Sequence, residues 1–93
     1  MRLNYDCIRD VLLSLEDMFV LNEDLETNII IVSDLCEELP DYSKQDIAYS
    51  LVMLEEADYI HANIQYADDC ILDIIVSGIT FEGHKYLDTV RTS

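Results

Sequence analysis

The chain has 93 residues, of which 20 are acidic and only five are Lys or Arg, so its formal net charge is −15 at pH 7. A surface this negative repels phosphate, and the composition therefore argues against direct binding of nucleic acid. Apolar residues make up 51% of the chain, too large a share for a segment that its charge keeps unfolded. The length suits one domain over residues 1–93.

Three cysteines, Cys7, Cys36 and Cys70, are widely spaced and form no C-x-x-C pair. An odd number of cysteines in this arrangement favours reduced, buried thiols. The sequence shows neither a secretory leader nor an apolar run of the roughly eighteen residues that a membrane helix needs. We therefore expect a soluble, cytoplasmic protein that makes no use of a membrane.

The first predicted element is a helix over residues 4–19. Apolar residues recur at positions 5, 8, 12, 15 and 19, the steps of three and four that define one helix face. Asn4 is the expected N-cap. A polar connection over 22–28 leads to a short β-branched strand at 29–32. A brief second helix, capped by Ser33, then ends at Leu39, before Pro40.

The third helix has the clearest signature in the chain. Residues 43–46, Ser-Lys-Gln-Asp, approximate a capping box, and the helix should continue to about Ala57. Ile47, Leu51 and Leu54 follow at helical spacing and should face the core.

Two strands and a last helix complete the pattern. Apolar residues alternate in two runs separated by a hairpin tip at 66–70, and Thr80 can cap a final helix over 81–91. The inward positions expected in the strands are Ile60, Ala62, Ile64 and Tyr66, then Leu72, Ile74 and Val76; those in the helix are Phe81, His84, Leu87 and Val90. The order α-β-α-α-β-β-α predicts an α+β fold, a winged helix, in which the third helix and the hairpin (the wing) would contact DNA.

Several strings resemble a family of small phage and prophage proteins of Firmicutes that is known only as a domain of unknown function. The first ten residues, MRLNYDCIRD, carry the most specific likeness, and residues 39–43, 54–60 and 79–88 add to it. The resemblance implies a winged-helix fold and a mobile-element origin, but no activity. Asp58 departs from the Gly that such proteins commonly have at this place, which leaves open whether a DNA role was kept.

Catalytic and metal-binding patterns are lacking. Adjacent carboxylates such as Glu37-Glu38 point about 100° apart on a helix, so solvation explains them better than acid–base catalysis. Zinc spacing of Cys and His, a calcium loop and a Gly-rich phosphate loop are also missing from the sequence. His84 is expected to be a core residue. We predict no enzymatic activity, no metal and no cofactor.

Direct DNA binding is the weaker interpretation of the fold. The exposed side of the third helix offers Lys44, Gln45 and Tyr49. Strong DNA binders commonly neutralise roughly six to ten phosphates, more than five basic residues can do on one protomer. A small transcriptional regulator, which uses Lys44, Gln45 and the terminal arginines in a dimer, nevertheless stays open as the alternative.

The acidic surface is itself a candidate binding site. Its charge exceeds the roughly 2 to 8 units that solubility requires. Carboxylates and tyrosines on the third helix and the wing could imitate DNA and occupy the basic groove of a nucleic-acid-binding protein, as acidic phage inhibitors of CRISPR effectors or restriction enzymes do. A protein–protein adaptor without mimicry, and a homodimer, are further possibilities. The candidate partner-binding residues are Asp41, Asp46, Tyr49, Glu55, Glu56, Asp58, Tyr66, Asp68, Asp69 and Asp73.

Overall fold

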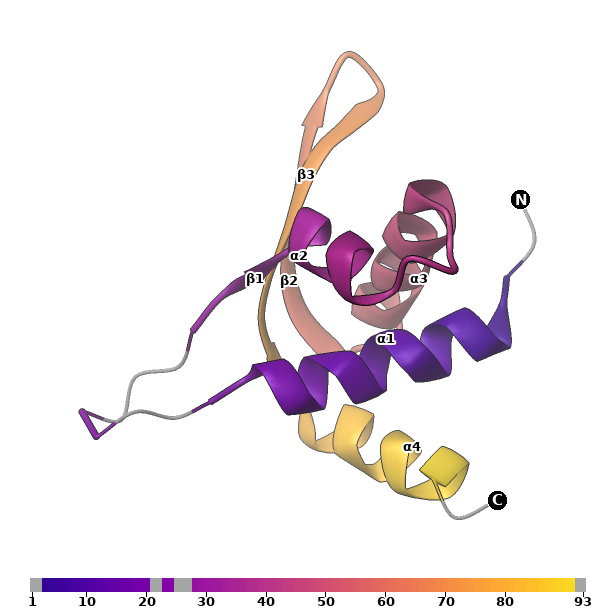
Figure 1. The fold of residues 1–93 in the computed structure, drawn as a ribbon. Coiled ribbons are helices and arrows are strands. Elements are labelled where there is room, and N and C mark those ends of the chain that lie inside the picture. The colour runs from indigo at the N-terminus through magenta and orange to yellow at the C-terminus, as the bar shows by residue number, and fades with distance from the viewer. Residues whose placement is uncertain (1–2, 21–22, 25–27, 92–93) are drawn as a thin grey trace.

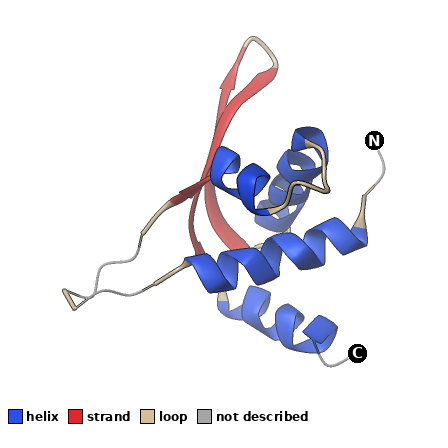
Figure 2. Ribbon diagram, viewed as in Figure 1, coloured by secondary structure: helices blue, strands red, loops and turns tan. Residues whose placement is uncertain are grey.

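The computed structural model describes residues 3–20, 23–24 and 28–91. In this part of the chain, four helices and a three-stranded antiparallel sheet form an α+β structure (Figures 1 and 2). The elements are, in order, α1 (Tyr5–Met18), β1 (Ile30–Ile31), α2 (Val32–Glu38), α3 (Lys44–Glu56), β2 (Ile60–Ala67), β3 (Cys70–Ile79) and α4 (Phe81–Arg91). Most of the polar connection predicted at 22–28 lies outside the described residues.

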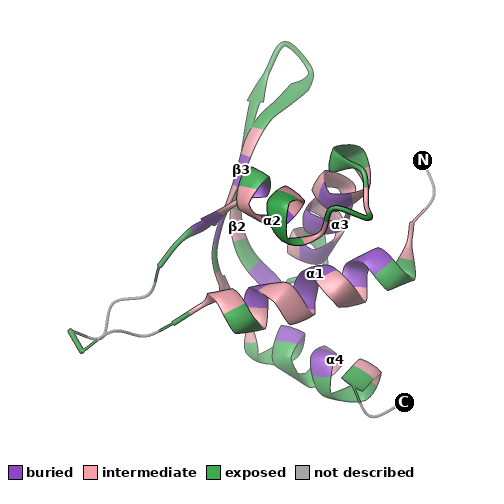
Figure 3. Cartoon of the chain, in the orientation of Figure 1, coloured by how far each residue is buried: buried purple, intermediate pink, exposed green. Residues whose placement is uncertain are grey.

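The helices pack around α1, which lies between α4 and the α2–α3 pair (Figure 1). The inner faces of the helices and of the sheet meet in one apolar core. None of the described helices is long and apolar enough to cross a membrane. The β2–β3 hairpin extends past the helices, so its outer end has no core beneath it (Figure 3).

Helices α1 and α3 begin directly after the cap residues that the sequence predicts. The Asn4 side chain accepts a hydrogen bond from the Cys7 N–H at 3.2 Å, and the Ser43 hydroxyl accepts one from the Asp46 N–H at 3.1 Å. Leu51 is fully buried, as predicted. Tyr5, expected in the core, is instead 69% exposed, because the first turn of α1 reaches the rim of the molecule.

The start of α2 differs from the prediction. The strand is shorter than expected, and the helix begins at Val32 with Ile31 as its N-cap, so Ser33 lies inside the first turn. The carboxylate of Asp34 accepts a hydrogen bond from the Ile31 N–H at 3.2 Å, and the side chain at the N-cap position makes no capping hydrogen bond. The chain therefore leaves the sheet after only two residues of β1.

The sheet has the strand order β1-β3-β2, with β3 in the centre. β1 pairs only with Ile75 and Val76 of β3, whereas β2 pairs along the whole hairpin. The turn consists of two residues, Asp68 and Asp69, whose φ angles are 49° and 67°. Positive φ at both positions is the geometry of a type I′ turn, which usually carries Asn-Gly or Asp-Gly.

A β-bulge changes the outer end of the hairpin. Gln65 pairs with Asp73 and Tyr66 with Ile71, so Leu72 is left without a partner on β2. Leu72 and Tyr66 were expected to face the core with Ile74, but they are 66% and 62% exposed. They are exposed because the hairpin projects beyond the helices that bury Ile74.

The buried face of α4 was predicted only in part. Leu87 is buried and Val90 packs against the core, as expected, but Phe81 is 76% exposed, His84 is exposed, and Gly83 is buried instead. A Cβ atom at Gly83 would collide with the carbonyl oxygen of Tyr59, so the helix approaches the chain before β2 through its glycine. This contact sets the rotation of α4, and it turns Phe81 and His84 toward solvent.

The three cysteines are not all buried. Cys7 is in the core, and burial raises the pKa of its thiol. Cys36 is half-buried, and Cys70 at the start of β3 is exposed. The expectation of three buried thiols was therefore wrong for Cys70, because this residue belongs to the projecting end of the hairpin.

Candidate partner-binding surface

A groove of about 480 Å³ separates the outer face of α3 from the hairpin. We call it the α3–β3 groove. Its lining is largely apolar and includes three charged residues, Lys44, Asp69 and Asp73. The lining residues are Val32 at the start of α2, Lys44, Gln45, Ala48, Tyr49 and Val52 on α3, and the six residues from Asp69 to Ile74.

Helix α3 presents apolar side chains on two faces. Ile47, Leu51 and Leu54 are buried in the core. Ala48 and Val52 follow beside this stripe at a spacing of four, half-buried against the core, and they line the groove together with Tyr49. The part of their surface that the core leaves uncovered gives this wall of the groove an apolar lining.

The hairpin supplies the opposite wall. Ile71 and Leu72 are 43% and 66% exposed, and Tyr66 pairs with Ile71 across the strands. Large apolar side chains this exposed, close together and rimmed by acidic residues, are typical of a surface that a partner covers.

The structure divides the predicted site residues into separate groups. Tyr49, Asp69 and Asp73 line the α3–β3 groove. Tyr66 and Asp68 lie beside it at the outer end of the hairpin. The fold therefore brings Tyr49, Asp69 and Asp73 together in the groove, and Tyr66 adjoins it through its cross-strand partner Ile71.

The other predicted residues lie elsewhere. Asp46 lines a hollow with the start of α1, and Glu56 lines one that includes Tyr59 and Tyr86. Asp41 precedes α3 and is exposed, and Asp58 follows α3. Glu55 is half-buried on α3.

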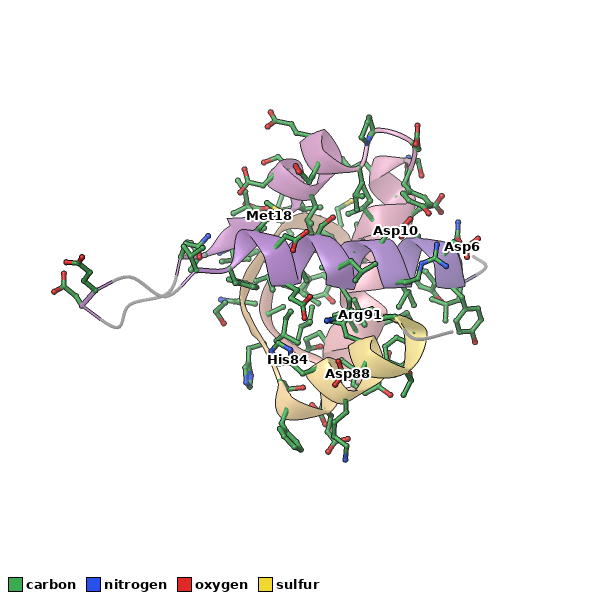
Figure 4. The ribbon with its side chains drawn as sticks, turned by 60° about the horizontal axis from the view of Figure 1, so that its bottom comes forward. Asp6, Asp10, Met18, His84, Asp88 and Arg91 are labelled. Atoms are coloured by element: carbon green, nitrogen blue, oxygen red, sulfur yellow. The ribbon has the colours of Figure 1, made fainter. Side chains whose placement is uncertain are left out.

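Among the residues that the structure describes, the Lys and Arg side chains outside the groove are paired with acids. Arg9 pairs with Asp6 and Asp10, and Lys85 pairs with Glu82 at 3.7 Å. Arg91 lies toward α1 at the end of α4 (Figure 4) and donates to the Glu16 carboxylate at 2.6 Å. Of the four basic residues that the structure describes, only Lys44 in the groove makes no ion pair, so little positive charge remains for phosphate.

The sequence was compared with known families and proteins. Residues 2–93, nearly the whole chain, match the family described as hypothetical protein (DUF2513). The chain belongs to this family. No curated protein and no solved structure shows significant similarity to it.

This DUF2513 member has groove residues that sequence reasoning missed. Ala48, Val52 and Ile71 carry no chemical signature, and their contribution depends on how α3 and the hairpin are placed. One signal was present in the sequence, because the apolar positions of α3 exceed what one buried stripe requires. Among the described residues, no group of three or more His, Cys, Asp or Glu could hold a metal ion.

Proposed function

We propose that this member of the DUF2513 family is a phage-type winged-helix protein that binds a basic, nucleic-acid-binding protein of the host bacterium. It acts in the cytoplasm, without catalysis, and inhibits its partner by occupying the site for nucleic acid. A CRISPR effector or a restriction enzyme has the required basic groove. The winged-helix assignment is supported by the order of the elements, with α3 followed directly by a long hairpin.

One observation carries the proposal. A winged helix contacts DNA through the outer face of its third helix and through its wing. In this protein those two elements enclose a groove that contains Tyr49, Asp69 and Asp73 beside apolar side chains. DNA would meet carboxylates there, whereas a basic protein would meet complementary charge and an apolar contact surface.

The charge also predicts how binding proceeds. Attraction between an acidic protein and a basic groove speeds association, by orders of magnitude at low salt. The apolar groove would then slow dissociation, because the desolvated centre of an interface contributes most of the affinity. Added salt should therefore reduce the association rate more than it raises the dissociation rate.

A small transcriptional regulator is the second candidate. Lys44 supports it, since this unpaired cation lies in the first turn of α3, beside Gln45, where a regulator would touch DNA. A regulator should retard duplex DNA in a gel at low salt, and the proposed inhibitor should not.

The test of the main proposal is affinity capture from a nuclease-treated bacterial lysate, eluted with a salt gradient. The wild type is compared with the double variant Asp69→Asn/Asp73→Asn and with the control Asp17→Asn/Glu38→Gln. Both variants lose two charges, but the control residues are exposed on α1 and α2, outside the groove.

The proposal expects a basic nucleic-acid-binding protein that the wild type and the control retain and the groove variant loses. The purified partner should then release DNA when the wild type is added. Equal retention by all three proteins, or retardation of duplex DNA by the wild type, would contradict the proposal.

A further inference from the structure

The α3–β3 groove follows an uncovered edge of the sheet. It is lined by six consecutive residues, Asp69 to Ile74, and by no residue of β2. Successive side chains of a strand point to opposite faces, so a groove over one face would be lined by alternate residues. Consecutive residues line a groove that runs beside the strand. The groove therefore lies along the edge of β3 that faces away from β2.

The same edge is covered by β1 only at Ile75 and Val76. The chain then turns into α2 at Val32, which lines the groove. Within the described residues, β3 consequently has a strand neighbour on only one side from Cys70 to Ile74. The backbone groups of this stretch that point away from β2 are open to an added strand.

Asp73 occupies this edge in the free protein. Its carboxylate accepts a hydrogen bond from the Ile74 N–H at 2.8 Å. An N–H group makes one good hydrogen bond, so Ile74 and its partner Ile64 form a non-hydrogen-bonded pair, and the Ile74 N–H points away from β2. A side-chain oxygen thus holds the position that the carbonyl group of an added strand would take.

We propose that the groove takes an extended, basic segment of the partner, which adds to β3 as a strand beside β1. Its backbone pairs with the edge between Cys70 and Ile74, and alternate apolar side chains pack against Ala48 and Val52. Lys or Arg side chains at the other positions reach Asp69 and Asp73. The Ile74 N–H then passes from the Asp73 carboxylate to a partner carbonyl, and the carboxylate is freed to pair with a cation. This inference rests on the proposed function and names the form of the bound segment.

The charges of the groove favour a basic partner over a second copy of the chain. An antiparallel pairing of two β3 edges would bring Asp69 and Asp73 of both copies together, in a protein of net charge −15. Like charges opposite one another destabilise paired strands, and Lys44 alone would oppose that repulsion in the groove. A basic segment removes the same repulsion by neutralising the carboxylates.

The test uses the full-length protein and three eight-residue peptides made of Lys and Val. In the first peptide the two residues alternate. The second has the same composition at helical spacing, and the third is the alternating peptide with N-methyl groups on alternate residues, prepared in both frames. Affinity is measured by titration, and backbone amide exchange reports which residues become protected.

The alternating peptide should slow the exchange of those amides between Cys70 and Ile74 that point away from β2, the Ile74 amide among them. N-methylation in the frame that faces β3 should weaken binding at least about tenfold, because it removes the hydrogen bonds of the added strand. The helical peptide should bind no better than the methylated one. Asp69→Asn/Asp73→Asn should weaken the alternating peptide, whereas Asp17→Asn/Glu38→Gln should not.

Other results overturn the inference in distinguishable ways. If all peptides bound in the groove with equal affinity and the amide exchange rates of β3 did not change, strand addition would be refuted. The proposal of an acidic protein-binding groove would still stand. If the peptides bound Asp69→Asn/Asp73→Asn as tightly as the wild type, or if no peptide bound at all, both the strand addition and the proposed function would be contradicted. Concentration-dependent dimerisation that protects the same amides would show that a second copy is the occupant.

Discussion

Gly83 of α4 lies directly against the backbone carbonyl group of Tyr59. A Cβ atom at position 83 would approach that oxygen well within the 3.0 Å that real Cβ atoms keep, and it would also meet the Ile79 side chain. Tyr59 and Tyr86 stack beside this contact with their ring centroids 5.1 Å apart. The glycine thus fixes how α4 packs.

Gly83→Ala is predicted to destabilise the protein. Alanine improves helix propensity by about 1 kcal/mol, but relief of the clash with a backbone atom should cost about 3 kcal/mol. The net effect is therefore a loss of stability. The matched control is Gly78→Ala, where a Cβ would lie at an ordinary 3.8 Å from His61. Urea unfolding should show a clear loss for the first variant and almost none for the second; similar curves would show that α4 does not pack as described.

Asp58→Gly is predicted to stabilise the protein by about 1 kcal/mol. Asp58 has a φ of 62° just after α3, and the Asp58 and Tyr59 N–H groups donate to the carbonyl groups of Glu55 and Leu54. This is a Schellman motif, whose left-handed position favours glycine. Removal of a negative charge from the C-terminal end of a helix adds to the gain.

Asp58→Ala separates these two effects. It removes the same charge but keeps the Cβ atom, and alanine lacks the polar side chain that helps Asp to adopt a left-handed conformation. Thermal unfolding should therefore show that Asp58→Gly is the most stable protein, that the wild type comes next, and that Asp58→Ala is the least stable. A glycine variant less stable than the wild type would refute the prediction.

The hairpin turn should respond in a similar way to Asp68→Asn/Asp69→Gly. Both turn residues have positive φ, and Asn-Gly is the preferred pair for a type I′ turn. The variant should slow amide exchange in β2 and β3 and stabilise the hairpin by roughly 1 kcal/mol. Since it also removes two acidic charges beside the groove, association with a basic partner should become slower. Faster exchange would show that the turn geometry is different.

Two leucines should separate stability from binding. Leu51 is fully buried, so Leu51→Ala should cost about 2–5 kcal/mol. Leu72 is 66% exposed in the groove, and Leu72→Ala should change stability by less than about 0.5 kcal/mol. The second variant should nevertheless bind the alternating peptide more weakly. If Leu72→Ala unfolded the protein, the hairpin end would have to be packed in the core.

Tyr42 should make stability depend on pH in alkaline solution. Its hydroxyl donates to the Asp10 carboxylate at 2.7 Å. This hydrogen bond, then burial, and then the charges of Asp10, Cys7 and Asp6 raise the pKa of Tyr42 to about 12. The ordinary value is about 10, so the folded state favours the neutral phenol.

The sign of the effect follows from this shift. The raised pKa of Tyr42 adds to the free energy of unfolding. This contribution is complete below about pH 10 and is lost as the pH rises through about 12, because the unfolded chain releases the phenol proton first. Tyr42→Phe should lower stability near neutral pH and flatten its decline between these values. Urea titrations at several pH values measure both effects, and an unchanged slope would rule out the hydrogen bond as the cause. Cys7, whose pKa is also raised, contributes in the same direction in both proteins.

Local sequence information determined most of the secondary structure. Asn4, Ser43 and Thr80 act as helix caps, and they could be recognised because a cap is a contact between residues three apart. The core face of α3 followed from periodicity alone. The acidic composition also pointed to a surface unsuited to phosphate, since net charge does not depend on the fold.

Only the tertiary structure decided which candidates share a surface. Leu72 and Ile74 have the same parity along the chain, yet a bulge and the projection of the hairpin expose one and bury the other. The rotation of α4 depends on a contact between Gly83 and a residue 24 positions earlier. Tyr49 and Asp73 also meet in one groove, while Asp46 and Glu56 do not. These outcomes depend on contacts between residues distant in sequence, and neither periodicity nor composition carries that information.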